Sequence, residues 1–188
     1  IFAACQALGE SVFITDNLFE FSPDLTVHEI VFACAGIYSD NHIISATEGA
    51  ALDAFAQAGG RVYIEGSDCF NYDPESASGY QIRPIFDLAD GPDGSGDLSN
   101  LTGLNDLAGF SFAYAGGNNF IDELQPVAST PIWKNTANVD NVGVFNAGYG
   151  TGAGRGIAAS YEFGGLVDVP SSIVRVPATH DVTDLVLA

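Results

Sequence analysis

Residues 29–68 read as one complete strand, helix, strand unit, and this unit constrains the fold more than any other part of the chain. Residues 30–37 form an almost unbroken apolar run, residues 45–58 have the pattern of an amphipathic helix, and residues 61–65 form a second apolar run. Two strands joined by such a helix lie parallel in one sheet. We therefore expect an α/β fold with a mostly parallel sheet and helices on both faces, in which ligands bind at the carboxyl ends of the strands.

The helix in this unit carries its own start and stop signals. Ser45 and Glu48 have the spacing of a capping box, in which each side chain accepts the backbone N–H group of the other residue. Apolar residues recur on one helical face, and Gly59 and Gly60 follow the last of them. We therefore predict a helix from about residue 45 to residue 58.

We expect a single domain over residues 1–188, with a long irregular insertion around residues 71–109. In the insertion the composition shifts to Asp, Gly, Ser and Pro, which favours loops over helices and strands. The part of the chain after it is predicted to be rich in β-strands. The strand patterns there cover residues 110–114, 126–133, 142–147 and 156–163, and an apolar segment near residues 182–187 is predicted as a last helix or strand.

A glycine-rich run at residues 148–156 resembles a phosphate-binding loop only superficially. A P-loop requires Gly-Lys followed by Ser or Thr, and a dinucleotide-binding loop must open a helix. Residues 157–160 instead continue as a strand pattern. We therefore predict a hairpin loop here and no nucleotide cofactor.

The N-terminal end lacks the strand with which a fold of this class normally opens. Residues 1–8 have a helix pattern, and a strand pattern follows only at residues 11–15. The chain begins at Ile1 and contains no Met, so we expect a processed protein or one part of a longer precursor. The first strand is then either upstream of Ile1 or supplied by another chain, and the second explanation predicts a subunit that assembles with copies of itself.

The charge balance is strongly acidic, because five basic residues face 24 acidic ones and the formal net charge is -19. Nucleic-acid binding depends on clustered Lys and Arg side chains, so DNA and RNA are excluded as partners. Anionic membrane surfaces are disfavoured for the same reason, and no apolar run is long enough for membrane insertion. The acidic surface fits simple solubility, a saline environment or the binding of divalent cations.

Three segments, at residues 36–42, 59–66 and 161–165, carry a resemblance to a known fold family. Over residues 12–166 the chain resembles modules of large secreted or surface-exposed bacterial proteins, which are relatives of the class I glutamine amidotransferase and flavodoxin-like fold. The resemblance implies a flavodoxin-like, mostly parallel sheet. It also implies an extracellular or cell-surface location and, as partners, copies of the chain or other domains of a longer precursor.

The chain departs from this family where the catalytic residues would lie. An amidotransferase-like enzyme places its nucleophile on a tight turn after the strand that ends at Glu65, in a Gly-x-Cys-x-Gly setting. Residues 66–70 read Gly-Ser-Asp-Cys-Phe, without the second glycine. The late His-x-Glu motif falls on residues 160–162, where the His is replaced by Ser. We therefore expect a non-enzymatic structural or binding module that has lost the catalytic residues.

The alternative function is a cysteine or serine hydrolase at the same edge of the sheet. Cys69 or Ser67 would be its nucleophile, and His42, in the polar loop after the first strand, would be its base. No acid that orients the histidine can be named from the sequence, as a catalytic triad requires. A histidine that only orders its own loop explains the pattern as well.

Carboxylates in the glycine-rich insertion are candidate ligands for calcium. Asp90, Asp93 and Asp97 lie at short spacing, and calcium prefers oxygen ligands. The segment lacks the alternating ligands and the closing Glu of an EF-hand loop, so an exposed acidic turn is the other interpretation. A second acidic cluster near the predicted edge of the sheet consists of Asp68, Asp73 and Glu75.

Overall fold

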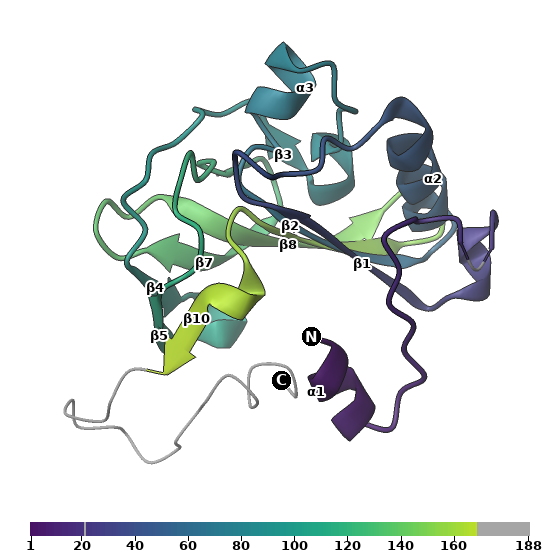
Figure 1. Cartoon of the computed structure of the whole chain (residues 1–188), viewed down its shortest axis with the longest axis horizontal. Helices are drawn as coiled ribbons and strands as arrows, with labels where there is room; N and C mark the ends of the chain where they lie inside the picture. The colour runs from purple at the N-terminus through teal and green to yellow at the C-terminus, as the bar shows by residue number, and fades with distance from the viewer. Residues whose placement is uncertain (21, 169–188) are drawn as a thin grey trace.

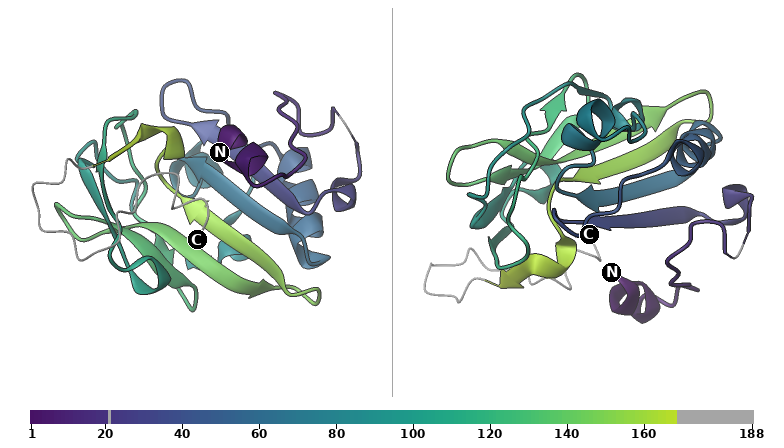
Figure 2. Two further views of the ribbon diagram at one scale, coloured as in Figure 1. Left: turned by 90° about the horizontal axis from the view of Figure 1, so that it is seen from below. Right: turned by 45° about the horizontal axis from the view of Figure 1, so that its top comes forward.

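The structure is a computed structural model that describes residues 1–20 and 22–168. Its main feature is an eight-stranded mixed sheet in the order β1-β2-β9-β8-β7-β4-β5-β10, which curls into a half-barrel (Figures 1 and 2). In that order the strands are β1 (Ile30–Gly36), β2 (Arg61–Gly66), β9 (Gly154–Ala159), β8 (Asn141–Tyr149), β7 (Thr130–Asn135), β4 (Asn100–Gly103), β5 (Ser111–Tyr114) and β10 (Leu166–Asp168).

Short elements connect and cover these strands. A second, two-stranded sheet pairs β3 (Leu88–Ala89) with β6 (Gln125–Pro126). The α-helices are α1 (Phe2–Ala7), α2 (Ala46–Gln57) and α3 (Tyr72–Ser76), and the 3-10 helices are η1 (Leu25–Val27), η2 (Arg83–Phe86), η3 (Asn105–Leu107) and η4 (Phe163–Gly165). No helix in the described part of the chain is long and apolar enough to cross a membrane.

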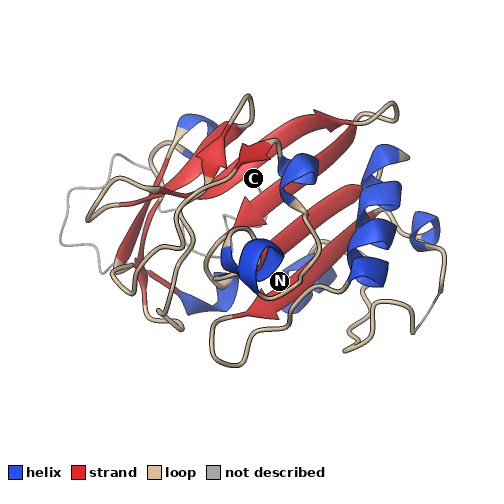
Figure 3. Ribbon diagram, turned by 90° about the horizontal axis from the view of Figure 1, so that it is seen from above, coloured by secondary structure: helices blue, strands red, loops and turns tan. Residues whose placement is uncertain are grey.

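The strand, helix, strand unit predicted from the sequence is confirmed. β1 and β2 are parallel neighbours, and α2 connects them across one face of the sheet (Figure 3). The predicted capping box is present, because Ser45 Oγ accepts the N–H group of Glu48 at 3.3 Å and Glu48 Oε2 accepts that of Ser45 at 2.9 Å. Gly59 follows the helix with a φ of 105°, a left-handed conformation that favours glycine.

The prediction of a mostly parallel, flavodoxin-like sheet with helices on both faces is wrong. Only β1, β2 and β9 run parallel, whereas every other neighbouring pair in the large sheet is antiparallel. The physical reason is the length of the connections. Parallel neighbours need a crossover of a dozen or more residues, usually with a helix, whereas β7, β8 and β9 follow one another through short turns. Within the described residues, α2 is the one helix longer than six residues.

The curl of the sheet separates two hydrophobic cores. The first lies between α2 and the parallel strands, and it includes Leu52 and Ile64. The second lies inside the curl among the antiparallel strands, where Phe112 and Trp133 pack with their ring centroids 5.8 Å apart. A sheet that buries both faces over part of its area has a well-defined register, because a slip of one residue would exchange the two faces.

Of the remaining predictions from the sequence, some are confirmed and others are not. The hairpin predicted around the glycine run is present, because β8 and β9 pair antiparallel on either side of it. Residues 11–15 are not in a strand. The stretch around residues 71–109 is mainly loops and short helical turns, yet it also supplies β4 to the large sheet. The apolar segment near residues 182–187 lies outside the described residues.

Candidate functional site

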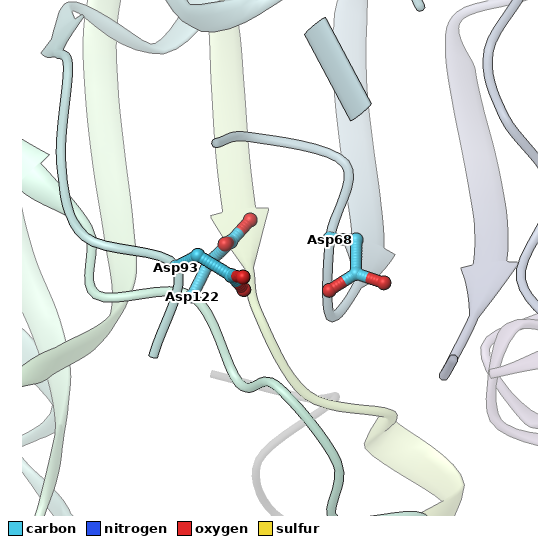
Figure 4. A group of neighbouring side chains, drawn as sticks. All are labelled: Asp68, Asp93 and Asp122. Atoms are coloured by element: carbon cyan, nitrogen blue, oxygen red, sulfur yellow. The ribbon is translucent and has the colours of Figure 1, made fainter. Parts of the chain in front are cut away.

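Three aspartates from distant parts of the chain meet at the carboxyl ends of β2 and β9 (Figure 4). Asp68 follows β2, Asp93 lies in the glycine-rich segment, and Asp122 lies in the loop between β5 and β6. One carboxylate oxygen from each lies within 4.8 Å of the others. We call Asp68, Asp93 and Asp122 the aspartate cluster. It lies at the edge of the sheet where α/β folds usually bind ligands.

Backbone hydrogen bonds hold the three loops together. The N–H group of Asp122 donates to the carbonyl oxygen of Ser67 at 3.2 Å, and the N–H group of Glu123 donates to that of Pro92 at 3.2 Å. The loops approach so closely that a Cβ atom on Gly94 would lie 1.8 Å from the carbonyl oxygen of Ile121. Only glycine fits at this position without moving the backbone.

Asn71 links all three loops through its side chain and its backbone. Its Nδ2 donates to the carbonyl oxygen of Pro92 at 2.8 Å and to that of Glu123 at 3.3 Å. The N–H groups of Phe70 and Asn71 both donate to Oδ2 of Asp122 at 3.0 Å. The carboxylate of Asp122 is therefore fixed in orientation by one of its two oxygens.

The other oxygens in the cluster are buried without a partner. Asp68 is 2% exposed and Asp122 is 0% exposed, whereas Asp93 is exposed. Within the described part of the chain, Oδ1 of Asp68 and Oδ1 of Asp122 accept no hydrogen bond. A buried carboxylate oxygen without a partner is strongly destabilising unless the group is protonated or meets a positive charge.

The surroundings make these acids weak. Burial, with contributions from Asp73 and Asp93, raises the pKa of Asp68 to about 7. Burial also raises the pKa of Asp122 to about 8, and the charges of Asp68 and Asp93 add to it, although the two backbone N–H donors act in the opposite direction. The pKa of Asp93 is raised by burial. Perturbed carboxyl groups that converge at a strand edge are typical of a functional site.

The structure does not pair the residues of the predicted hydrolase as that hypothesis requires. His42 is 62% exposed in its side chain, and its Nε2 lies 3.1 Å from both carboxylate oxygens of Glu48. Cys69 is buried, and its Sγ donates to the carbonyl oxygen of Gly66 at 3.3 Å. Burial raises the pKa of the Cys69 thiol well above its ordinary value, which opposes formation of the nucleophilic thiolate.

Ser67 is also buried and hydrogen-bonded to neighbouring parts of the fold. Its side chain is fully buried, and its Oγ accepts the N–H group of Tyr38 at 3.1 Å. The backbone N–H group of Ser67 donates to Gly36 at the end of β1. These contacts give Ser67 a structural role between two strand ends.

The three candidate calcium ligands of the insertion do not form a common group of ligands. The carboxylate of Asp90 pairs with the guanidinium group of Arg83. Asp97 accepts the side-chain N–H groups of Asn135 at 3.0 Å and Asn138 at 2.9 Å. Of the three, Asp93 alone joins a group of carboxylates close enough to share one ion.

Asp122 is the member of the cluster that the sequence did not single out. It lies in an Ile-Asp-Glu segment without glycines or further acids at metal-binding spacing, and more than 50 residues separate it from Asp68. No local pattern brings it to the end of β2. The one available signal is a pair of acidic residues, Asp122 and Glu123, between two apolar residues, Ile121 and Leu124, which are both buried.

Comparisons with known proteins show similarity in structure alone. No protein-family model matches the chain, and no curated protein sequence matches it significantly. An exo-β-1,4-mannosidase, Op5Man5 from Opitutaceae bacterium strain TAV5, superposes with a TM-score of 0.56 and 12% identity over 85% of this chain and 25% of the enzyme. A β-galactosidase from Rahnella sp. R3 gives a TM-score of 0.50 and 16% identity over 74% of this chain and 21% of the enzyme.

A third similar structure is Gan42B, a GH42 β-galactosidase from G. stearothermophilus, with a TM-score of 0.50 and 14% identity over 72% of this chain. The chain spans only about a fifth to a quarter of the length of these enzymes. The resemblance to a flavodoxin-like glutamine amidotransferase module is therefore wrong, because the similar structures are parts of glycosidases with a mixed, curled sheet. At this level of identity the comparison shows the fold and not an activity.

Proposed function

We propose that the chain is a non-enzymatic structural module that assembles with a second copy of itself through one face of its sheet. The observation that carries this proposal is a strip of apolar side chains on the open face of the parallel strands. It consists of Ile30, Phe32 and Cys34 on β1 and Tyr63 on β2, and we call it the β1 strip.

The alternation along β1 defines the strip. Val31 and Ala35 point into the core beneath α2, whereas Ile30 is 41% exposed and Phe32 is 40% exposed on the opposite face. Phe32 lies against Tyr63, with their ring centroids 5.6 Å apart. A sheet face open to water usually carries polar side chains, so an apolar open face favours contact with another protein.

The N-terminal helix leaves the strip accessible. Figure 1 shows α1 on the opposite side of the sheet from α2, the side that carries the strip. With α1 in this position, Ile30 and Phe32 are still 41% and 40% exposed. The helix therefore does not cover the strip.

The charge at the border of the strip fits an acidic partner. Arg61 on β2 and Arg155 on β9 are neighbours in register and both are exposed on this face. These are two of the five basic residues in a chain with a net charge of -19. A second copy of the chain offers a predominantly acidic surface, which suits a head-to-tail contact with the two arginines.

The position of β1 at the edge of the sheet also supports assembly. Among the described residues β1 has a neighbouring strand, β2, on one side only. An edge strand with free backbone groups can accept a strand from another chain. A strand supplied by a second copy would add at this edge.

The similar structures support the idea of a module. This fold forms about a quarter or less of two β-galactosidases and one mannosidase, so it occurs there together with other parts of a larger protein. A domain of the same longer chain is the other partner that the strip would fit. An extracellular or cell-surface location stays a prediction.

The oligomeric state in solution tests the proposal. Light scattering coupled to size exclusion, over a range of protein concentrations, should show a dimer or larger assembly for the native chain. Phe32→Glu should give a monomer, because it places a charge in the centre of the apolar strip. Val127→Glu changes an equally apolar residue that is 67% exposed outside the strip, and it should assemble like the native chain.

A second variant keeps the test decisive if Phe32→Glu fails to fold. The double change Arg61→Glu and Arg155→Glu leaves the apolar contacts in place and reverses the charge at the border. It should weaken assembly most at low ionic strength, because salt screens surface charges. A native chain that stays monomeric at all concentrations would overturn self-assembly and leave another domain as the occupant of the strip.

A further inference from the structure

The aspartate cluster differs from an ordinary acidic surface patch. Two of its three members are almost completely buried, and each of these two has one oxygen without a hydrogen-bond partner among the described residues. We propose that Asp68, Asp93 and Asp122 bind one divalent cation, with calcium preferred. No other group of three His, Cys, Asp or Glu side chains in the described part of the chain is close enough to share an ion.

The burial of the cluster selects a small ligand. The unpartnered oxygens of Asp68 and Asp122 each expose less than 1 Å² to solvent, so a sugar or another organic molecule cannot reach both. A single ion is small enough for such a site, and Asp93, which is exposed, marks the side from which it would enter. Exposed Asp93 would also let water complete the coordination shell on the solvent side.

The spacing of the oxygens fits a single shared ion. Two ligands on opposite sides of an ion are separated by at most twice the metal-oxygen distance, which is about 4.8 Å for calcium and about 4.2 Å for magnesium. The three carboxylate oxygens lie within 4.8 Å of one another, so one calcium ion could contact all three. Calcium also accepts flexible geometry and six to eight oxygen ligands, whereas magnesium requires a near-ideal octahedron.

The surrounding structure prepares Asp122 for this role. Its Oδ2 accepts the N–H groups of Phe70 and Asn71, so only Oδ1 remains for an ion. The side chain of Asn71 holds the segment before Asp93 at the same place through its bond to Pro92. Asn71 is thus a positioning residue, because it orients the ligands through their loops.

The mutual repulsion of the cluster also favours a cation. In the absence of an ion, three adjacent carboxylates repel one another when they are ionised. A bound cation would offset this repulsion and stabilise the ionised carboxylates.

Calcium titration of the full chain tests the proposal. After removal of divalent ions with a chelator, calcium chloride should raise the melting temperature by about 5–10 °C at a calcium concentration of 100 times Kd. Magnesium chloride should give a smaller shift, and sodium chloride at matched ionic strength should give almost none. Isothermal titration calorimetry with calcium chloride should report one site per chain.

Variants distinguish the cluster from the rest of the acidic surface. Asp122→Asn and Asp68→Asn should abolish the calcium response, and Asp93→Asn, at the exposed member, should weaken affinity more than about tenfold without affecting folding. Asp97→Asn, from the ligand set predicted by sequence, and Asp106→Asn, at an exposed and distant position, should both respond like the native chain. Asp106 serves as the matched control for loss of one surface charge.

Several results would overturn the proposal. The absence of any calcium-dependent shift would do so, as would a shift that survives in Asp122→Asn or is lost in Asp97→Asn. A magnesium response equal to that of calcium would contradict the preference for the larger ion. The calcium response should persist in Phe32→Glu, so failure of the self-assembly proposal and failure of the cation proposal are separate outcomes.

Discussion

The backbone N–H group of Asn71 donates a hydrogen bond of 3.0 Å to Oδ2 of Asp122, across 51 positions of sequence. Together with the bond from Phe70 it occupies Oδ2, and it leaves Oδ1 without a hydrogen-bond partner among the described residues. It also attaches the loop after β5 to the loop after β2. Stability and ligand binding are therefore expected to depend on the same few contacts.

Replacement of Asn71 with Ala should lower the free energy of unfolding by about 1–3 kcal/mol. The side chain donates to two carbonyl oxygens, of Pro92 and Glu123, which would lose a partner in a mainly buried site. Urea unfolding measures this change. Asn100→Ala removes an exposed amide that, among the described residues, donates to Ser99 Oγ alone, and it should stay within about 0.5 kcal/mol of the native chain. Equal effects of the two changes would contradict the role given to Asn71.

The chelated protein should become less stable as the pH rises from about 5 to about 8. The pKa values of Asp68 and Asp122 are raised to about 7 and about 8 in the folded chain, against about 3.9 for an unfolded Asp. The folded state therefore binds more protons, and its advantage is lost as these groups ionise. Each group contributes a slope of at most about 1.4 kcal/mol per pH unit.

Melting temperatures in chelator at several pH values measure this slope. The other acidic side chains also repel one another as the pH rises, so the comparison with Asp122→Asn isolates the buried group. That variant should show a shallower decline, and saturating calcium should flatten the profile of the native chain. A decline of equal slope in the native chain and in Asp122→Asn would count against the raised pKa of Asp122.

Gly94→Ala should destabilise the protein by more than about 2 kcal/mol and reduce cation binding. The new methyl group would lie 1.8 Å from the carbonyl oxygen of Ile121, so one of the two loops of the site must move away. Gly148→Ala is the matched control, because a Cβ atom there meets nothing within 4 Å. Chemical unfolding should place the control close to the native chain, and similar losses for both variants would show that the loop approach is unimportant.

Cys69 should resist alkylation in the folded protein at neutral pH. Its thiol is buried, its pKa is raised by burial, and it donates to Gly66. Iodoacetamide treatment followed by peptide mass spectrometry should find Cys69 unmodified until denaturant is added. Rapid modification in the native state, lost in His42→Ala, would instead favour the hydrolase with Cys69 as its nucleophile.

Local sequence signals predicted the parts of the fold that depend on neighbouring residues. The capping box of Ser45 and Glu48, the parallel pairing of β1 and β2 and the β8–β9 hairpin all rest on short-range patterns. The direction of the later strands does not rest on short-range patterns. It depends on how residues 71–140 return across the sheet, and the parallel unit at the start of the chain gave no information about that path.

The residues of the aspartate cluster divide in the same way, into those with a local sequence signal and one without. Asp68 was recognised because it follows an apolar strand, and Asp93 because it lies among glycines. The sequence nevertheless assigned them to separate acidic groups, since their proximity arises only from the hydrogen bonds between distant loops. Asp122 had no local signal and required the three-dimensional arrangement.

The parallel pairing of β2 with β9 has a consequence for how the chain is made. Arg61 pairs with Arg155, so the residues that complete this pairing leave the ribosome long after β2 does. Until then the inner edge of β2, with apolar Val62 and Ile64, lacks its partner and can associate with other nascent chains. A fragment that ends at residue 140 should therefore aggregate on expression, and a soluble, folded fragment would contradict this. Synthesis of the intact protein then depends on keeping β2 apart from other chains until its last partner emerges.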